Sequence, residues 1–127
     1  MTQFKSLYAT LDRLWPIAIK LRDGRCMICG TAICELDAHH SIVSRSAKAT
    51  RWHLLNGISL CRNCHTAVHN AVAVANLQLA IDRIASADQQ AEIFRLGHKI
   101  FKPYLQWCES HIDYLKRFIK EHENKRK

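Results

Sequence analysis

The sequence has no hydrophobic run that approaches the roughly 18 residues that a membrane-spanning helix needs. It also lacks a basic head followed by a continuous apolar stretch at the N-terminus, which is the pattern of a secretory leader. It has no internal repeat, and its one low-complexity segment is the short basic tail. We therefore expect a soluble, cytoplasmic protein without a membrane partner.

Acidic residues are scarce: 11 aspartates and glutamates stand against 19 lysines and arginines, which gives a formal net charge of +8. This excess favours an anionic partner, with nucleic acid first and an acidic membrane face second. The 127 residues suffice for one domain and leave no room for a second core of comparable size. We therefore treat residues 1–127 as a single domain.

Four of the six cysteines form two Cys-x2-Cys pairs with 31 residues between them. The pairs are Cys26 with Cys29 and Cys61 with Cys64. A secreted disulfide framework usually spreads its cysteines through a smaller, core-poor domain, so we interpret the pairs as metal ligands. Zinc takes four tetrahedral ligands, and two such turns complete a closed structural Zn²⁺ site, unless one pair is incidental. Cys34 and Cys108 are left over, and we expect free thiols without a chemical role there.

Residues 1–25 form a mildly basic arm whose apolar positions are spaced 4, 3, 4 and 3 residues apart. These positions are Leu7, Leu11, Leu14, Ala18 and Leu21. The spacing predicts an amphipathic helix. Pro16 removes a backbone donor and clashes with the preceding turn, so we expect a kink near Trp15 or two shorter helices.

Residues 26–70 carry many turn signals and few long apolar runs. We expect a zinc knuckle at Cys26–Gly30 and a strand near 35–40. A polar loop then leads to a short strand at Ile58–Leu60 and to a helix that begins near Cys61. The predicted order is strand, loop, strand, helix.

The C-terminal part of the chain, residues 71–127, is predicted to be helical. A first helical pattern begins before it, at His65, and continues to about Ala85. A Ser-x-x-Gln sequence at Ser86 resembles a capping box that opens a second helix, running to about Phe101. Beyond Pro103, apolar residues again step 3, 4, 3 and 4 along a last helix that ends in a basic run. These residues are Leu105, Cys108, Ile112, Leu115 and Ile119. The stripe is short for an independent coiled coil, so we expect packing within the chain, with a homodimer through the terminal helices as the alternative.

Histidines suggest a second metal site. His65 and His69 are four residues apart on the expected helix, so their imidazoles project from one face and can share an ion. Such a pair by itself is as often solvated or packed as bound to metal. Here it accompanies the adjacent pair His39 and His40 and the loop residue Asn56, which favours a metal-bound reaction centre.

This combination resembles the HNH endonucleases, the ββα-metal nucleases. Similar enzymes have a histidine or acid directly before the general-base histidine at the end of the first strand, an asparagine in the loop, and a histidine nine residues later on the helix. The matching positions are His39, His40, Asn56 and His65. His69 is similar to the third metal-binding histidine of colicin-type DNases, and the four-cysteine clamp is similar to that of phage and restriction HNH proteins. The resemblance covers residues 26–69, about a third of the chain.

The resemblance implies a one-metal hydrolysis of DNA that leaves 5′ phosphates. His40 would be the general base and Asn56 would brace the loop, while a histidine set would hold the catalytic ion. That set is His39, His65 and His69. Swapped roles for His39 and His40 stay open, because adjacent strand residues point to opposite faces. Mg²⁺ or Mn²⁺ is the expected catalytic ion, although three imidazoles suit Zn²⁺ or Ni²⁺ as well.

The family would also place the polar loop beside the active site, where its basic residues could hold DNA phosphates. These are Arg45, Arg51 and Lys48, and a merely solvated loop is the alternative. We expect Trp52 to fill the core under the strands rather than to stack on a base. Two alternative functions stay open. One is a non-catalytic, zinc-stabilised nucleic-acid-binding module, which has no use for four histidines. The other is a nuclease-derived structural or partner-binding protein that presents its terminal helices to another chain.

The expected fold class is α+β and mostly helical. It has a small ββα-metal (HNH) core, residues 26–70, that carries the four-cysteine zinc knuckle. An N-terminal helical arm, residues 1–25, and two to three C-terminal helices, residues 71–127, flank this core. The resemblance further suggests that the protein is phage or prophage encoded.

Overall fold

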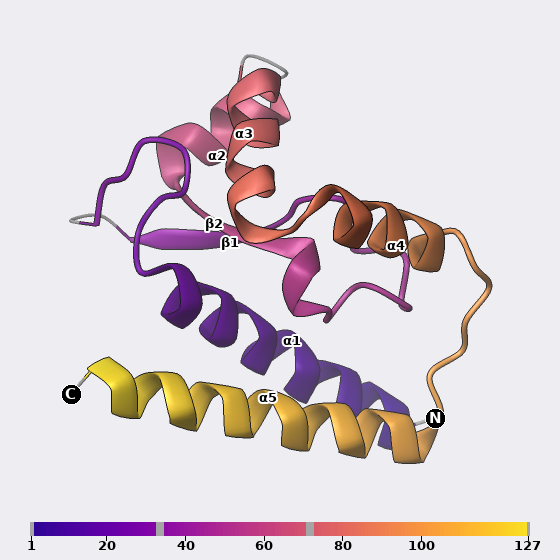
Figure 1. The fold of residues 1–127 in the computed structure, drawn as a ribbon. Coiled ribbons are helices and arrows are strands. Elements are labelled where there is room, and N and C mark those ends of the chain that lie inside the picture. The colour runs from indigo at the N-terminus through magenta and orange to yellow at the C-terminus, as the bar shows by residue number, and fades with distance from the viewer. Residues whose placement is uncertain (1, 33–34, 71–72, 127) are drawn as a thin grey trace.

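The computed structural model describes residues 2–32, 35–70 and 73–126, which form an α+β structure that is mostly helical (Figure 1). This part of the chain has five α-helices, one short 3-10 helix and one two-stranded antiparallel sheet. In chain order they are α1 (Thr2–Asp23), β1 (Leu36–His40), η1 (Leu54–Asn56), β2 (Gly57–Cys61), α2 (Arg62–His69), α3 (Val74–Ile84), α4 (Ala87–Gly97) and α5 (Leu105–Arg126). The predicted mix of one N-terminal helix, a small sheet and C-terminal helices is confirmed. Within the described ranges, no helix combines the length and apolarity that a membrane crossing needs.

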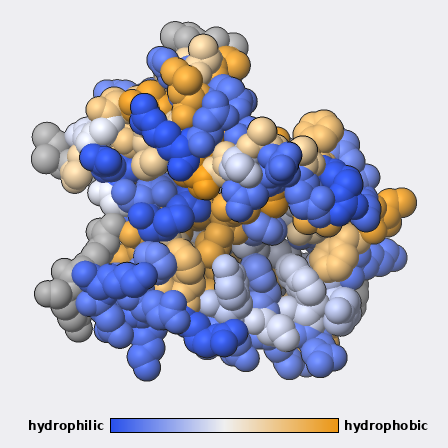
Figure 2. Space-filling view, viewed as in Figure 1, coloured by the Kyte–Doolittle hydropathy of each residue, from blue (hydrophilic) through white to orange (hydrophobic). Residues whose placement is uncertain are grey.

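The two longest helices, α1 and α5, lie side by side beneath the sheet, and both begin at the same end of the molecule (Figure 1). Their apolar stripes face each other and form the larger core. Its buried members from these two helices are Leu11, Leu14, Trp15, Ala18, Ile19, Cys108, Ile112 and Leu115. The prediction that the C-terminal stripe packs within the chain is therefore confirmed. The outer face of α5 is mainly hydrophilic (Figure 2).

Helix α1 continues through Pro16 from Thr2 to Asp23, so the expected division into two shorter helices is wrong. An interior proline costs about 3 kcal/mol in a helix. The neighbouring side chains of Trp15, Ala18 and Ile19 are almost fully buried. Burying each large apolar side chain contributes about 1.5–3 kcal/mol, so packing on both sides of the proline outweighs its cost.

Strand β1 pairs with β2 in a register that sets His39 opposite Ile58 and His40 opposite Gly57. Helix α1 presses directly on this pairing, since a Cβ atom added at Gly57 would overlap the side chains of Trp15 and Ile19. A glycine is therefore needed at the start of β2 for α1 to approach the sheet.

The C-terminal end of α1 is also bonded to the sheet region. The Arg22 guanidinium donates hydrogen bonds to the carbonyl oxygens of Leu54 (2.6 Å) and Gly57 (2.7 Å). The Asp23 carboxylate accepts a hydrogen bond from the backbone N–H of Ser59 at 2.8 Å. These bonds fix α1 against β2 and so determine which side chains α1 presents to the histidines.

The predicted strands and the helix start near Cys61 are confirmed, but the helical segment expected from His65 to about Ala85 is divided. Helix α2 ends at His69, and α3 begins at Val74. The capping box at Ser86 is present, with hydrogen bonds in both directions between Ser86 and Gln89.

Helix α4 ends at Gly97, before the predicted end near Phe101. Glycine has low helix propensity. At this position, a Cβ atom would also overlap Val43 of the loop. Contact with the distant residue Val43 thus requires a glycine at the end of α4.

Candidate functional site

The four cysteines of the two pairs form one cluster in which one Sγ atom from each lies within 4.8 Å of the others. The Sγ atoms of Cys29 and Cys61 are 3.7 Å apart. Tetrahedral zinc with Zn–S bonds of about 2.3 Å has its sulfurs about 3.8 Å apart. The cluster can therefore hold a metal ion such as zinc.

Local backbone geometry forms each half of this cluster. Gly30 adopts a φ of 81°, which lets its N–H turn back to the carbonyl of Cys26 at 2.9 Å. The backbone N–H groups of Cys29 and Cys64 point to the sulfurs of Cys26 (3.5 Å) and Cys61 (3.4 Å), respectively. Cys61 is at the same time the N-cap of α2. These donors suit thiolates, which are the form that binds zinc.

The thiols of the cysteine cluster differ in the direction of their pKa shifts. Burial raises the pKa of the Cys26 thiol, but backbone N–H groups outweigh burial and bring its pKa down to about 6. Burial and the neighbouring sulfurs raise the pKa of Cys64. Like charges this close repel strongly, so four thiolates can share this space only around a cation.

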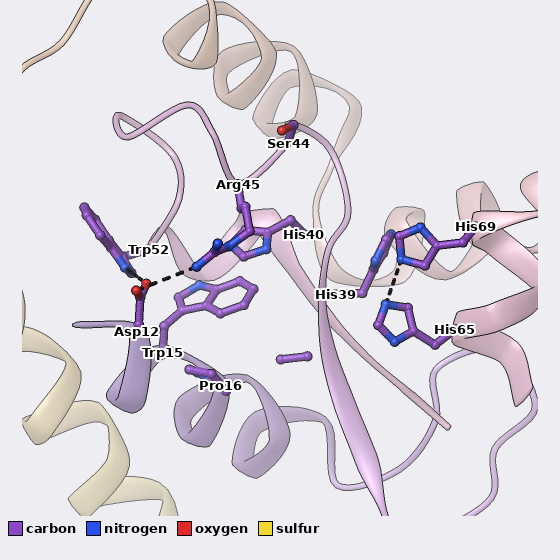
Figure 3. Close-up of a pocket in the computed structure, with 11 residues that line it drawn as sticks. Asp12, Trp15, Pro16, His39, His40, Ser44, Arg45, Trp52, His65 and His69 are labelled. Atoms are coloured by element: carbon purple, nitrogen blue, oxygen red, sulfur yellow. Dashed lines mark hydrogen bonds and ion pairs between the residues drawn. The ribbon is translucent and has the colours of Figure 1, made fainter. Parts of the chain in front are cut away.

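The second cluster joins His39 of β1 to His65 and His69 of α2, with one ring nitrogen from each within 4.8 Å of the others (Figure 3). The Nε2 atoms of His65 and His69 are 3.0 Å apart. Ligand nitrogens of a tetrahedral zinc site, at about 2.0–2.1 Å from the ion, lie about 3.3 Å from one another. The three imidazoles can therefore share one ion.

Asp37 had no predicted role, but its carboxylate lies 3.1 Å from Nδ1 of His65 and also accepts a hydrogen bond from Arg62 at 2.9 Å. Burial raises the Asp37 pKa, but the bonds from His65 and Arg62 outweigh it and lower the pKa below its ordinary value. A charged carboxylate at Nδ1 keeps the proton there and leaves Nε2 of His65 free for a metal. Strand alternation was the available signal, because Asp37 and His39 are two residues apart on one face of β1.

His40 is not part of the histidine cluster, although it lines the same cavity. Its ring stacks on Trp15 with centroids 4.2 Å apart, and Nε2 lies 2.8 Å from the Arg51 carbonyl oxygen. A nitrogen beside a carbonyl must carry the proton, which leaves Nδ1 as an acceptor. Burial lowers the pKa of His40, so the ring stays neutral at a neutral pH. This separation favours His39 over His40 as the metal ligand.

The cavity has a volume of about 580 Å³ and contains all four of these histidines. Asp12 of α1, which also had no predicted role, lines the side of the cavity opposite the three clustered histidines (Figure 3). The Asp12 carboxylate accepts hydrogen bonds from the Trp52 indole N–H at 2.8 Å and from the Arg51 guanidinium at 2.7 Å. No local pattern could indicate this role, because Asp12 lies about 40 residues from its partners.

The three basic loop residues occupy different surroundings. Arg45 lines the histidine cavity with a side chain that is 62% exposed and lies 3.7 Å from Asp12. Arg51 is 16% exposed and paired with Asp12 through two bonds, and it does not line the cavity. Lys48 lies over the Tyr8 ring, 5.9 Å from its centroid. Of the three, only Arg45 lines the cavity with the histidines, whereas Arg51 contacts His40 through its backbone carbonyl.

Asn56 is fully buried and makes the loop-bracing contacts that were expected of it. Its Oδ1 accepts from the N–H groups of Ile42 (3.0 Å) and Val43 (2.8 Å). Its Nδ2 donates to the carbonyls of Val43 (2.9 Å) and Thr50 (3.2 Å). The loop that follows His40 is thereby held in a single shape.

Two further predictions concern packing. Trp52 is 1% exposed and belongs to the larger core, so the expectation of a core tryptophan is confirmed. Cys108 is a buried free thiol between α1 and α5. Cys34 lies outside the described residues.

Comparison of the chain with protein-family models, with curated proteins and with solved structures gave no significant match.

Proposed function

We propose that the protein is a metal-dependent endonuclease of the HNH type that hydrolyses DNA phosphodiester bonds. The observation that carries the proposal is the convergence of His39, His65 and His69 on one point, with His40 lining the same cavity. The strand, strand, helix order of β1, β2 and α2 and the adjacent four-cysteine cluster support it. A module that only binds nucleic acid would not need this arrangement.

In the proposed mechanism, the three clustered histidines would hold a divalent ion, and Asp37 keeps the His65 ring in the tautomer that leaves Nε2 free to bind it. When bound, the ion would neutralise charge on a phosphate oxygen and on the leaving oxygen. Three imidazoles favour Mn²⁺, Zn²⁺ or Ni²⁺ at least as much as Mg²⁺, which prefers oxygen ligands.

His40 accepts the proton from the attacking water. The Trp15 stack and the Arg51 carbonyl fix its ring, and its lowered pKa keeps an acceptor nitrogen available at neutral pH. As water gives its proton to His40, its oxygen bonds to phosphorus and the bond from phosphorus to the 3′ oxygen breaks. The 3′ oxygen takes a proton from solvent and leaves as a 3′ hydroxyl, and the phosphate stays on the 5′ oxygen of the other product.

Arg45 holds a phosphate beside the reacting one. It is the exposed arginine of the cavity, and its 3.7 Å contact with Asp12 is long enough to exchange for a phosphate at small cost. Arg51 keeps a positioning role instead, since its guanidinium is occupied by Asp12 while its carbonyl holds His40.

Nicking of supercoiled plasmid DNA tests the proposal, with Mg²⁺, Mn²⁺, Zn²⁺ and Ni²⁺ supplied separately. We expect the wild-type protein to nick, and we expect His40→Ala to be about 10²–10⁴-fold slower, the usual contribution of a general base. The matched control is His98→Ala, an exposed histidine at the end of α4 that faces neither cluster. It should cut at the wild-type rate.

Two outcomes would overturn the proposal. Equal cutting by the wild-type protein and His40→Ala would remove His40 from the mechanism. Retained DNA binding without cutting under any of the four ions would leave the non-catalytic zinc module as the function.

A further inference from the structure

We infer that a second cavity, beside the histidine cavity, binds a nucleotide of single-stranded DNA; this rests on the proposed function and specifies its substrate class. The cavity measures about 670 Å³, within the range of about 300–1,000 Å³ that is typical of small-ligand sites. It lies where the first turns of α1 meet the loop before η1 and the segment that joins α4 to α5.

Its lining combines flat apolar rings with positive charge. Phe4, Tyr8 and Phe101 provide the rings, and Lys5, Lys48 and Lys102 provide the charge. None of the described residues that line this cavity is acidic. A ligand that fits must carry a flat apolar group and negative charge together. A nucleobase with its phosphate meets both requirements, because bases stack on aromatic rings and lysines attract the backbone.

The rings are available to such a ligand. Phe4, Tyr8 and Phe101 are each only partly buried. The Phe4 and Tyr8 rings are tilted by 46° at 6.0 Å, so they do not cover each other as a face-to-face pair would. Lys48 lies over the Tyr8 ring, where its ammonium can meet the phosphate of a base stacked nearby.

This lining favours a single strand over a duplex. Bases inside a duplex are stacked on both faces, and an aromatic side chain reaches such a face only after the base has left the stack. The partly exposed rings of α1 and of the segment between α4 and α5 can therefore stack on an unpaired nucleotide, whereas an intact duplex offers them no free base face.

The two cavities are neighbours along α1. The Tyr8 ring of the second cavity lies 5.4 Å from the ring of Trp52, which lines the histidine cavity. Phe4 and Asp12 are eight residues apart on this helix, a rise of about 12 Å. One strand can thus occupy both cavities, which makes a single strand, or a duplex with an unpaired branch, the preferred substrate.

Fluorescence anisotropy tests this with a labelled single strand and with a blunt duplex of the same sequence. The protein carries His40→Ala, so that no cutting occurs and binding is read independently of the proposed chemistry. Phe101→Ala in this background should weaken single-strand binding by roughly ten-fold or more, as loss of one stacking partner does, with little change for the duplex. Lys102→Ala should weaken single-strand binding and reduce its salt dependence.

Matched controls are Phe94→Ala and Lys116→Ala, an exposed ring on α4 and an exposed lysine on α5 that do not line this cavity. Both should bind the single strand as the parent does. Phe101→Leu separates stacking from packing: it keeps the apolar volume, and its thermal midpoint should match the parent while its single-strand affinity falls.

Unchanged single-strand binding in Phe101→Ala would overturn the inference, as would equal losses for single strand and duplex. If the plasmid assay shows nicking while Phe101→Ala binds normally, this inference fails alone. If nicking fails while Phe101→Ala loses single-strand binding selectively, the endonuclease proposal fails and the nucleotide site stands.

Discussion

At the scale of single residues, the two faces of β1 divide the histidine chemistry. Asp37 and His39 lie on one face toward α2, where Asp37 bonds to His65. His40 lies on the other face and stacks on Trp15 of α1. Because side chains alternate along a strand, the candidate ligand His39 and the candidate base His40 are adjacent in the sequence but point to opposite faces of β1.

Substitution of Asp37 tests whether its carboxylate positions the metal ligand His65. Asp37→Ala should raise the Mn²⁺ concentration that gives half-maximal nicking by about 10–100-fold, because the His65 ring loses the partner that fixes its tautomer. The measurement is a Mn²⁺ titration of plasmid nicking. Asp113→Ala, which removes an exposed carboxylate of α5, is the control and should leave the titration unchanged. An unchanged midpoint in Asp37→Ala would mean that this carboxylate does not position a ligand.

At the scale of elements, α5 is joined to the loop before η1 by a histidine. The ring nitrogen Nε2 of His111 lies 2.8 Å from the Trp52 carbonyl oxygen, so it donates a hydrogen bond to it. Burial lowers the pKa of His111, and burial together with His111 lowers the pKa of the adjacent His53. Burial of both rings, which outweighs the hydrogen bond from His111 to Trp52, therefore favours their uncharged form at this contact.

The lowered pKa values of these two histidines predict that the folded protein loses stability as the pH falls. The unfolded chain binds protons at the ordinary histidine pKa of about 6.5, whereas the folded chain binds them at a lower pH. The contribution of the two uncharged rings to the free energy of unfolding is therefore complete above about pH 6.5. It is lost as the pH falls through their lowered pKa values in the folded chain. Urea unfolding at about pH 7.5 and about pH 5.5 should show this loss.

His111→Gln, which can still donate to the Trp52 carbonyl, should lose less stability over the same interval. The exposed His98→Gln serves as control and should show the full wild-type loss. An undiminished loss in His111→Gln would show that this ring does not contribute to the acid sensitivity.

At the scale of the whole molecule, the described residues form two hydrophobic clusters of unequal size. The larger one joins α1 and α5 to Trp52 and Leu54. The smaller one has five buried members and includes two of the clustered cysteines. Its buried members are Cys26, Ile58, Leu60, Cys61 and Ala80. So small a core gains more from a metal clamp than the larger one would.

Metal removal tests this at the molecular scale. The purified protein should contain about one tightly held zinc per chain, and a strong chelator should lower its thermal midpoint because metal binding contributes to folding. Cys26→Ser should lose this zinc and mimic the chelator, whereas Cys108→Ala should keep it, since Cys108 lies in the other core. His65→Ala should also keep it. Full zinc retention in Cys26→Ser would locate the ion elsewhere.

The sequence predicts those parts of the site whose ligands lie within a few residues of one another. The spacing within each cysteine pair and between His65 and His69 is fixed by one turn of chain, so these residues converge for reasons that the sequence shows directly. The capping box at Ser86 and the two apolar stripes are local in the same sense.

Only the tertiary structure decided what surrounds those ligands. Asp12, Trp15 and Arg22 contact the loop and sheet from a helix that is separated from β1 by 12 residues, and no spacing rule connects them to their partners. The same holds for the continuity of α1 through Pro16 and for the second cavity, whose rings come from both ends of the chain. The His-x3-His and Cys-x2-Cys spacings were determined by the sequence because backbone geometry repeats over a few residues. The cavity walls were determined by burial of the α1 and α5 stripes, an energy that depends on which distant surfaces meet.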